Sequence, residues 1–380
     1  MHTRKAFCTL LTVCLAAMLG AQNLSLAEFN LATTGFFREG ESTPNIISEG
    51  AIAFRYVPSD WLRVKARGTL ETSDTVDFFQ PVTDLNEPAS LAFDGASAEF
   101  HEPGNRPVSI TLFTGYYDDP ASGSLLRELQ KTEIPEPEFH SSPSGNAFSP
   151  VTEITGTGIA LTSAPPRGSA ILGMYGYWNN RTGSDASFTC DFRIGGAYTR
   201  ITYNLFGGLT FASGEPNPGI RTGLTTLFGT DSGNTLYLAA GLRNFTPGTS
   251  TAARNLYFIF EPRIRAGAAE LSLAFFSSPV FPENVPSWIS ADAESNYLGS
   301  NIGLAFGDGV KGRVRGGINP MGTINPEQPA ELTPFSFSIS PFISARVSDF
   351  VFELTAAVKP LLIDDPLTMG EIRASVKAVY

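Results

Sequence analysis

The chain has 380 residues, of which 42% are hydrophobic and 17% charged, and its 26 basic and 37 acidic side chains give a net charge of −11. This acidic balance argues against nucleic-acid binding, and mean hydropathy near zero without an apolar run of about 18 residues excludes a helical membrane bundle. Three cysteines, two of them near the amino terminus, exclude a disulfide framework.

Residues 1–27 have the layout of a secretory signal peptide. Arg4 and Lys5 precede a mainly apolar run over residues 6–19, and small residues at Ala21 and Ala27 offer cleavage sites. About 14 apolar residues are short for a membrane helix, although an anchor and a lipoprotein acylated at Cys14 stay open as alternatives. The mature chain, residues 28–380, would carry 24 basic and 37 acidic side chains and a net charge of −13.

The mature chain alternates apolar and polar residues, a period of two that predicts β-strands. We expect about eighteen strands, with sixteen as the alternative count. The clearest are residues 61–71, 186–198, 256–266, 310–319 and 370–380, and the least certain are 28–38, 152–163 and 220–229.

The predicted connections alternate in length along the chain. About eight short turns, such as Pro58 to Asp60 and Ser348-Asp349, interleave with about nine longer links. This order indicates an even number of antiparallel strands with both termini on one side. The sequence therefore predicts an all-β protein, a single closed antiparallel transmembrane β-barrel, because closure satisfies the sheet edges that hydrocarbon cannot.

The last strand alternates Ile372, Ala374, Val376 and Ala378 with polar residues and ends on Tyr380. It resembles the closing strand of bacterial outer-membrane β-barrels. That resemblance implies residence in the bacterial cell outer membrane, contact with outer-membrane lipid, and recognition of Tyr380 by the barrel-assembly machinery. Aromatic residues near strand ends fit the two bilayer interfaces, with Trp61, Tyr117, Tyr177 and Trp178 among them.

Basic residues fall on the polar face of three predicted strands, toward the periplasmic half of the wall. They are Arg63, Lys65, Arg67, Arg263, Arg265, Lys311, Arg313 and Arg315. Because charge facing lipid is costly, this parity predicts that they line the lumen. One interpretation makes them an electrostatic filter with anion preference, and the other makes them part of a solvated wall of mixed charge that includes Glu71, Glu99, Asp191, Glu261 and Glu270.

The longest predicted link, residues 118–151, is acidic and rich in proline. Its acids are Asp118, Asp119, Glu128, Glu133, Glu136 and Glu138. By position it resembles the constriction loop of general-diffusion porins, where loop acids oppose basic wall residues, although its prolines equally suit an exposed surface loop. The resemblance also implies a homotrimer, although no face in the sequence marks a trimer contact.

The sequence predicts a passive water-filled porin for small hydrophilic solutes, because barrels of sixteen to eighteen strands leave an aqueous channel. One alternative is an adhesin or ligand-binding barrel that displays acidic outer loops, and another is a hydrophobic-substrate transporter of the fatty-acid-channel type. Histidine occurs only at His2, His101 and His140, so we expect no enzyme activity, metal or cofactor.

Overall fold

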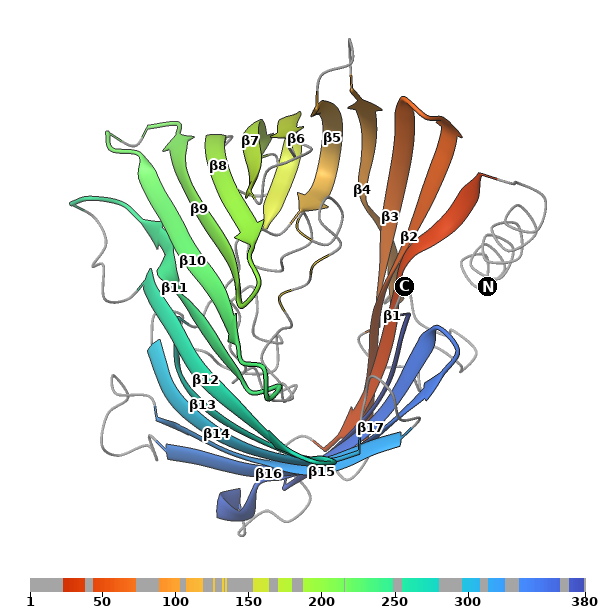
Figure 1. Cartoon of the computed structure of the whole chain (residues 1–380), viewed down its shortest axis with the longest axis vertical. Helices are drawn as coiled ribbons and strands as arrows, with labels where there is room; N and C mark the ends of the chain where they lie inside the picture. The colour runs from red at the N-terminus through yellow and green to blue at the C-terminus, as the bar shows by residue number, and fades with distance from the viewer. Residues whose placement is uncertain are drawn as a thin grey trace, which may run out of the picture.

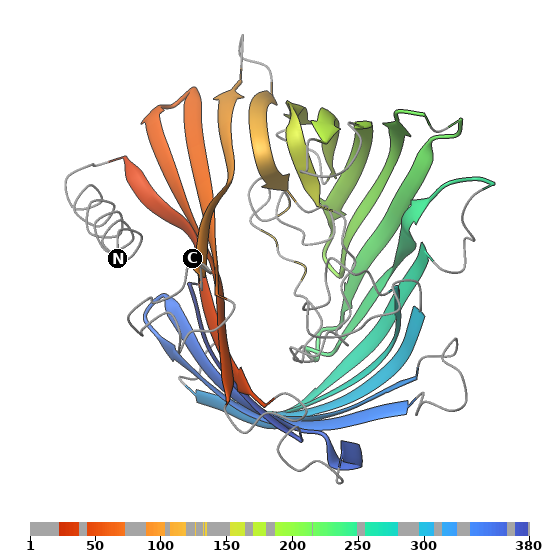
Figure 2. The ribbon, with the colours of Figure 1, turned by 180° about the vertical axis from the view of Figure 1, so that it is seen from behind.

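The computed structural model describes residues 23–37, 44–72, 89–102, 107–118, 126, 132, 134, 153–163, 170–179, 187–214, 216–248, 255–279, 296–307, 314–324, 335–362 and 369–378. These residues form an 18-stranded antiparallel sheet that closes on itself, because β1 (Leu24–Phe36) pairs with both β2 (Asn45–Ser59) and β18 (Gly370–Ala378). Figures 1 and 2 show the closed wall from its two sides. The predicted fold class and the larger strand count are confirmed.

Each strand pairs with the next along the chain. The remaining strands are β3 (Leu62–Thr72), β4 (Ala89–His101), β5 (Val108–Asp118), β6 (Ile154–Ser163), β7 (Ala170–Asn179), β8 (Ser187–Ala197), β9 (Ile201–Ala212), β10 (Gly219–Gly229), β11 (Thr235–Phe245), β12 (Leu256–Ala266), β13 (Ala269–Pro279), β14 (Asn296–Phe306), β15 (Val314–Ile324), β16 (Phe335–Val347) and β17 (Phe350–Val358), and one 3₁₀ turn, η3, spans Pro360–Leu362. We call the barrel end with the β2–β3 and β8–β9 connections the turn end, and the opposite end the loop end.

Alternation sorts side chains between two faces of the wall. In β12, Phe258 and Phe260 are exposed on the outer face, whereas Tyr257 and Ile259, which alternate with them, are each 1% exposed on the inner face. The outer face is an apolar band that suits hydrocarbon, and the inner face carries the charges. No helix among the described residues has the length and apolar character needed to cross a bilayer.

Two strand boundaries differ from those expected from sequence. β1 begins at Leu24 and pairs with Tyr56 of β2, so it starts ahead of the boundary expected at residue 28. β15 continues through Pro320 to Ile324, beyond the boundary expected at residue 319, and the expected start over residues 310–313 lies outside the described residues. Pro320 is tolerated there because the β14–β15 ladder is interrupted beside it while the β15–β16 ladder continues, so its missing N–H breaks no ladder.

The aromatic side chains near strand ends lie on both faces of the wall, whereas the sequence predicted all of them at the bilayer interfaces. Trp61 and Trp178 are each 57% exposed near strand ends and suit the bilayer interfaces. Tyr117 and Tyr177, expected beside them, instead pack in an inner cluster with Phe113, and the Phe113 and Tyr117 rings stack 4.5 Å apart. The face follows from alternation and not from position near a strand end: Tyr117 has the parity of the buried Phe113, and Tyr177 has that of the buried Tyr175.

The wall parts between β4 and β5 on the loop side. Asp94 is an extra residue in β4 opposite β3, Tyr117 is an extra residue in β5 opposite β6, and β4–β5 pairing ends at Gly95 and Gly115. Gly115 has a φ of 78° and approaches the Asp94 carbonyl so closely that an added Cβ would lie 2.0 Å from it. Only glycine fits this position. The last residues of β5 thereby leave β4 while they stay paired with β6.

Candidate functional site in the barrel lumen

Two described residues of the segment after β5 lie inside the barrel. Of its described residues, Leu126 is 0% and Ile134 2% exposed, and both belong to one apolar cluster. Its wall members are Ile171, Tyr237, Ala239, Ile259, Ala274, Phe276 and Met321. These residues share the inner face with buried charges, so Leu126 and Ile134 lie in the lumen. Of the two expectations for residues 118–151, the inward-folded loop therefore describes these two positions.

The root of this loop is held by a buried ion pair. Arg193 Nη1 of β8 donates to Asp118 Oδ2 at 2.8 Å, and its Nε donates to Asn204 Oδ1 at 2.8 Å. The Tyr175 hydroxyl donates to the same carboxylate oxygen at 3.3 Å. Arg193 is 0% exposed, so the pair is shielded from water. We call Asp118, Arg193, Asn204 and Tyr175 the loop-root network.

Two residues beyond Arg193 in β8, Leu126 packs against the wall at Gly195. A Cβ added to Gly195 of β8 would lie 3.2 Å from Leu126 Cδ2 and 3.2 Å from Ile171 Cγ1. The absence of a side chain at Gly195 therefore leaves the space that Leu126 occupies. The parting of β4 and β5 and the loop-root network lie at the end of β5, and Gly195 contacts Leu126, the next described residue of the chain.

The predicted basic residues that the structure describes lie on the inner face, and wall carboxylates pair with the five arginines among them. Arg63 pairs with Glu99 at 3.2 Å, Arg67 with Glu28 at 3.0 Å and with Asp94, and Arg263 with Glu261 at 2.5 Å. Arg265 and Arg315 both bind Glu270, the latter at 2.6 Å. Lys65 lies on the same face, opposite Arg55 of β2. This geometry is that of a wall of mixed charge.

Several predicted site residues lie outside the described residues: Lys311, Arg313, Asp119, Glu128, Glu133, Glu136, Glu138 and Tyr380. The expected opposition of loop acids and wall cations across a constriction therefore stays a prediction. Asp118, the one described member of the acidic set, faces Arg193 of the wall at the root of the loop.

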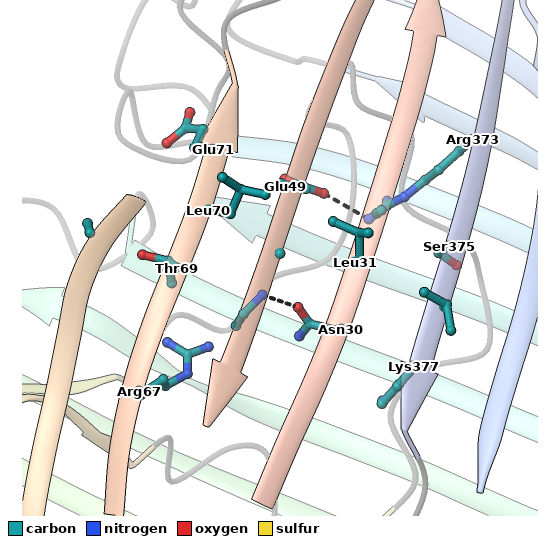
Figure 3. A pocket seen from close by; sticks show the side chains of 15 residues that line it. Asn30, Leu31, Glu49, Arg67, Thr69, Leu70, Glu71, Arg373, Ser375 and Lys377 are labelled. Atoms are coloured by element: carbon teal, nitrogen blue, oxygen red, sulfur yellow. Dashed lines mark hydrogen bonds and ion pairs between the residues drawn. The ribbon is translucent and has the colours of Figure 1, made fainter. Parts of the chain in front are cut away.

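A cavity of about 630 Å³ lies along the inner face of β18, β1, β2 and β3, with Ala92 of β4 at its edge. Figure 3 shows its polar lining, in which Arg373 Nη2 donates to Glu49 Oε1 at 2.9 Å and Asn30 Oδ1 accepts the Ala51 N–H at 2.6 Å. In the ribbon these strands face β11 and β12 across the lumen (Figure 1). The loop anchors therefore lie on one side of the barrel and the open wall on the other.

Sequence reasoning missed four charged residues that the structure makes central: Arg193, Arg221, Glu49 and Arg373. Arg221 of β10 bridges Asp191 of β8 and the Tyr177 hydroxyl, and donates to the Glu153 carbonyl at 3.1 Å. The period of two placed Arg193 and Arg373 on polar faces, which is the signal that could have found them. Their partners lie far away along the chain and depend on register.

The described residues offer little for catalysis. No group of three or more His, Cys, Asp or Glu among them could hold a metal ion. His101 contacts Ser109 at 3.2 Å and Glu99 at 3.4 Å, beside the Arg63–Glu99 pair, as part of the wall. Cys190 is exposed among outward-facing residues of β8.

No protein-family model and no curated protein sequence matches the chain. Its structure is similar to the crystal structure of OccAB3 from Acinetobacter baumannii, with a TM-score of 0.56 and 12% identity, over 93% of this chain and 98% of that one. It is also similar to the outer membrane protein OpdK from Pseudomonas aeruginosa, with a TM-score of 0.54 and 11% identity, over 94% and 99% of the two chains. The expected resemblance to bacterial outer-membrane barrels is thus confirmed for the fold.

Proposed function

We propose that the protein is a passive, water-filled channel for small hydrophilic solutes in a bacterial outer membrane. The observation that carries the proposal is the polar, charged cavity on the inner face of an 18-stranded closed barrel whose outer face is apolar. A wall of this size is too wide for side chains alone to fill. The similarity to an outer membrane protein in fold supports the same placement.

In this account the inward loop narrows the lumen from one side. Leu126 and Ile134 bind to the wall of β7, β11–β13 and β15, and the open cavity lies along β18 and β1–β3. Solutes would pass along that open wall, where polar and charged groups replace part of their hydration. No step in this passage needs a reacting group, a metal or a cofactor, so we propose no enzyme activity.

The amino-terminal residues fit export through the inner membrane. Strand β1 begins at Leu24, and Leu24 and Leu26 pair with Tyr56 and Phe54 of β2. Cleavage of the leader after Ala21 would keep these pairs, whereas cleavage after Ala27 would remove them. We therefore favour cleavage after Ala21, with Tyr380 as an assembly signal. A homotrimer stays a prediction, as does display of the outer loops to a ligand.

Reconstitution of the mature protein in planar bilayers tests the channel directly. We expect stepwise conductance increases, with each step due to one inserted barrel or assembly. Liposomes that contain the protein should swell in small neutral sugars and not in large ones. A correctly folded, detergent-extracted sample that gives neither conductance steps nor swelling would refute the proposal.

A substitution at Arg315 tests the contribution of wall cations to ion preference. Arg315 and Arg265 share Glu270, so Arg315→Glu would place two carboxylates beside a single guanidinium. We expect the reversal potential in a salt gradient to move toward cations. Arg200→Glu, in an exposed turn where Arg200 pairs with Asp231, is the matched control and should leave it unchanged. Equal effects of the two variants would show that Arg315 does not set selectivity.

A further inference from the structure

The open cavity has an ordered charge pattern along its length. On the inner face, Glu49 of β2 and Glu71 of β3 are direct cross-strand partners, and both lie toward the loop end of their strands. Lys377 of β18 lies at the turn end of its strand and is the cross-strand partner of Asn30. Toward the loop end the cavity carries Glu71, Glu49 and the Arg373 that binds Glu49, and toward the turn end it carries Lys377 and Arg67, as Figure 3 shows.

Pairing within the cavity leaves one charge of each sign available. The Arg373 guanidinium already binds Glu49 at 2.9 Å. Glu71 and Lys377 are exposed and make no ion pair with any residue that the structure describes. Glu49 lies directly beside Glu71, and because like charges repel, a cationic group that binds at Glu71 gains more electrostatic free energy. The middle of the cavity offers uncharged hydrogen-bonding groups at Asn30, Thr69 and Ser375.

The spacing of these charges sets the size of a solute that reaches both. The strands that carry Lys377 and Glu71 are separated by β1 and β2, so three strand spacings of about 4.8 Å, or about 14 Å, lie between them across the wall. Cross-strand pairing places Glu71 level with Ser375, so Lys377 also lies two residues, or about 7 Å, further along the wall. Glutamate and lysine side chains are long and flexible, so the two charged groups can move toward each other across part of this distance. What is left fits a small molecule with a cationic and an anionic end.

We propose that this cavity favours zwitterionic solutes, which enter with the ammonium group toward Glu71 and the carboxylate toward Lys377. The inference rests on the channel function proposed above and names a solute class for it. A simple anion or cation meets one attractive and one repulsive charge along the path. A zwitterion in this orientation meets two attractive charges, and its remaining polar atoms can bond to Asn30, Thr69 and Ser375.

Liposome swelling measures the preference as a ratio of rates. The probes are glycylglycine, a zwitterion, and arabinose, a neutral solute of similar size. In the double variant Glu71→Gln/Lys377→Gln we expect the glycylglycine-to-arabinose ratio to fall about threefold to fivefold, because each exposed charge contributes modestly. Arabinose swelling should stay unchanged. Arg200→Gln/Asp231→Asn, which removes an exposed pair from the turns, is the matched control and should leave the ratio unchanged.

Exchange of the two charges is a second test, in which the expected result is that the preference for the zwitterion is kept. Glu71→Lys/Lys377→Glu should restore the high ratio with the solute reversed, whereas either single neutralisation should lower it. If the double neutral variant swells normally in arabinose with an unaltered ratio, the zwitterion inference is wrong and the channel stands. If no variant and no native sample swells in arabinose, the channel proposal itself fails and takes the inference with it.

Discussion

The double substitution Leu126→Asp/Ile134→Asp should enlarge the conducting path, with single-channel conductance up by about half or more. Both side chains are buried in the apolar lumen cluster, and burying an unpaired charge there is far more costly than losing the contact. We expect the loop to leave its seat on Gly195 while the 18-stranded wall stays closed. Planar-bilayer recording gives the conductance, and detergent-resistant migration of the unheated barrel reports the fold.

Conservative changes at the same positions separate loop release from general damage. Leu126→Met/Ile134→Val keeps both positions apolar and should leave conductance near the native value, since Leu→Met conserves volume and Ile→Val removes one methyl group only. If the aspartate variant folds and conducts as the native protein does, Leu126 and Ile134 do not hold a constriction.

The second large effect is expected at the loop-root network. Asp118→Asn or Arg193→Met alone breaks a buried ion pair and leaves one charge without its partner, which typically costs about 3–5 kcal/mol. We expect noisier current with frequent transitions to larger conductance, because the end of β5 has no β4 partner to hold it in the wall. Thermal unfolding of the detergent-solubilised barrel gives the change in stability.

A double-mutant cycle isolates the ion pair from its surroundings. Asp118→Asn/Arg193→Met leaves no uncompensated charge, so its stability loss should be smaller than the sum of the two single losses. Strict additivity would mean that Asp118 and Arg193 do not act on each other. Arg200→Met and Asp231→Asn, a pair in the exposed turns, serve as the control and should leave current noise unchanged.

The alternation of apolar and polar residues and the turn residues between strands were enough to predict most of the fold. Alternation fixes strand identity and face because side chains in a strand point to opposite sides, and Leu256–Ala266 shows it without error. Turn residues such as Gly267 and Ala268 fix where neighbouring strands reverse. The ion pair of Arg265 with Glu270, five residues apart across that turn, was within reach of the same reasoning.

The candidate site was harder to predict because it depends on register between distant strands. Arg67 and Glu28 are 39 residues apart, Arg193 and Asp118 are 75, and Arg373 and Glu49 are 324. Irregularities at Ala27, Asp94 and Tyr117 shift the pairing by one residue each, and no local signal marks them. A one-residue shift exchanges the two faces of a strand, and the one at Tyr117 brings Asp118 to the inner face together with Phe113. Tyr117 and Tyr177, expected at the bilayer interfaces, lie inside by plain alternation with Phe113 and Tyr175.

The most direct test of the account is which side of the lumen carries the current. In a Cys190→Ser background, Ser375→Cys places a thiol on the open cavity and Ala239→Cys places one beneath the loop cluster. We predict that a bulky, water-soluble thiol reagent lowers single-channel current at Ser375→Cys and leaves it unchanged at Ala239→Cys. Blockade at Ala239→Cys with no effect at Ser375→Cys would contradict the account.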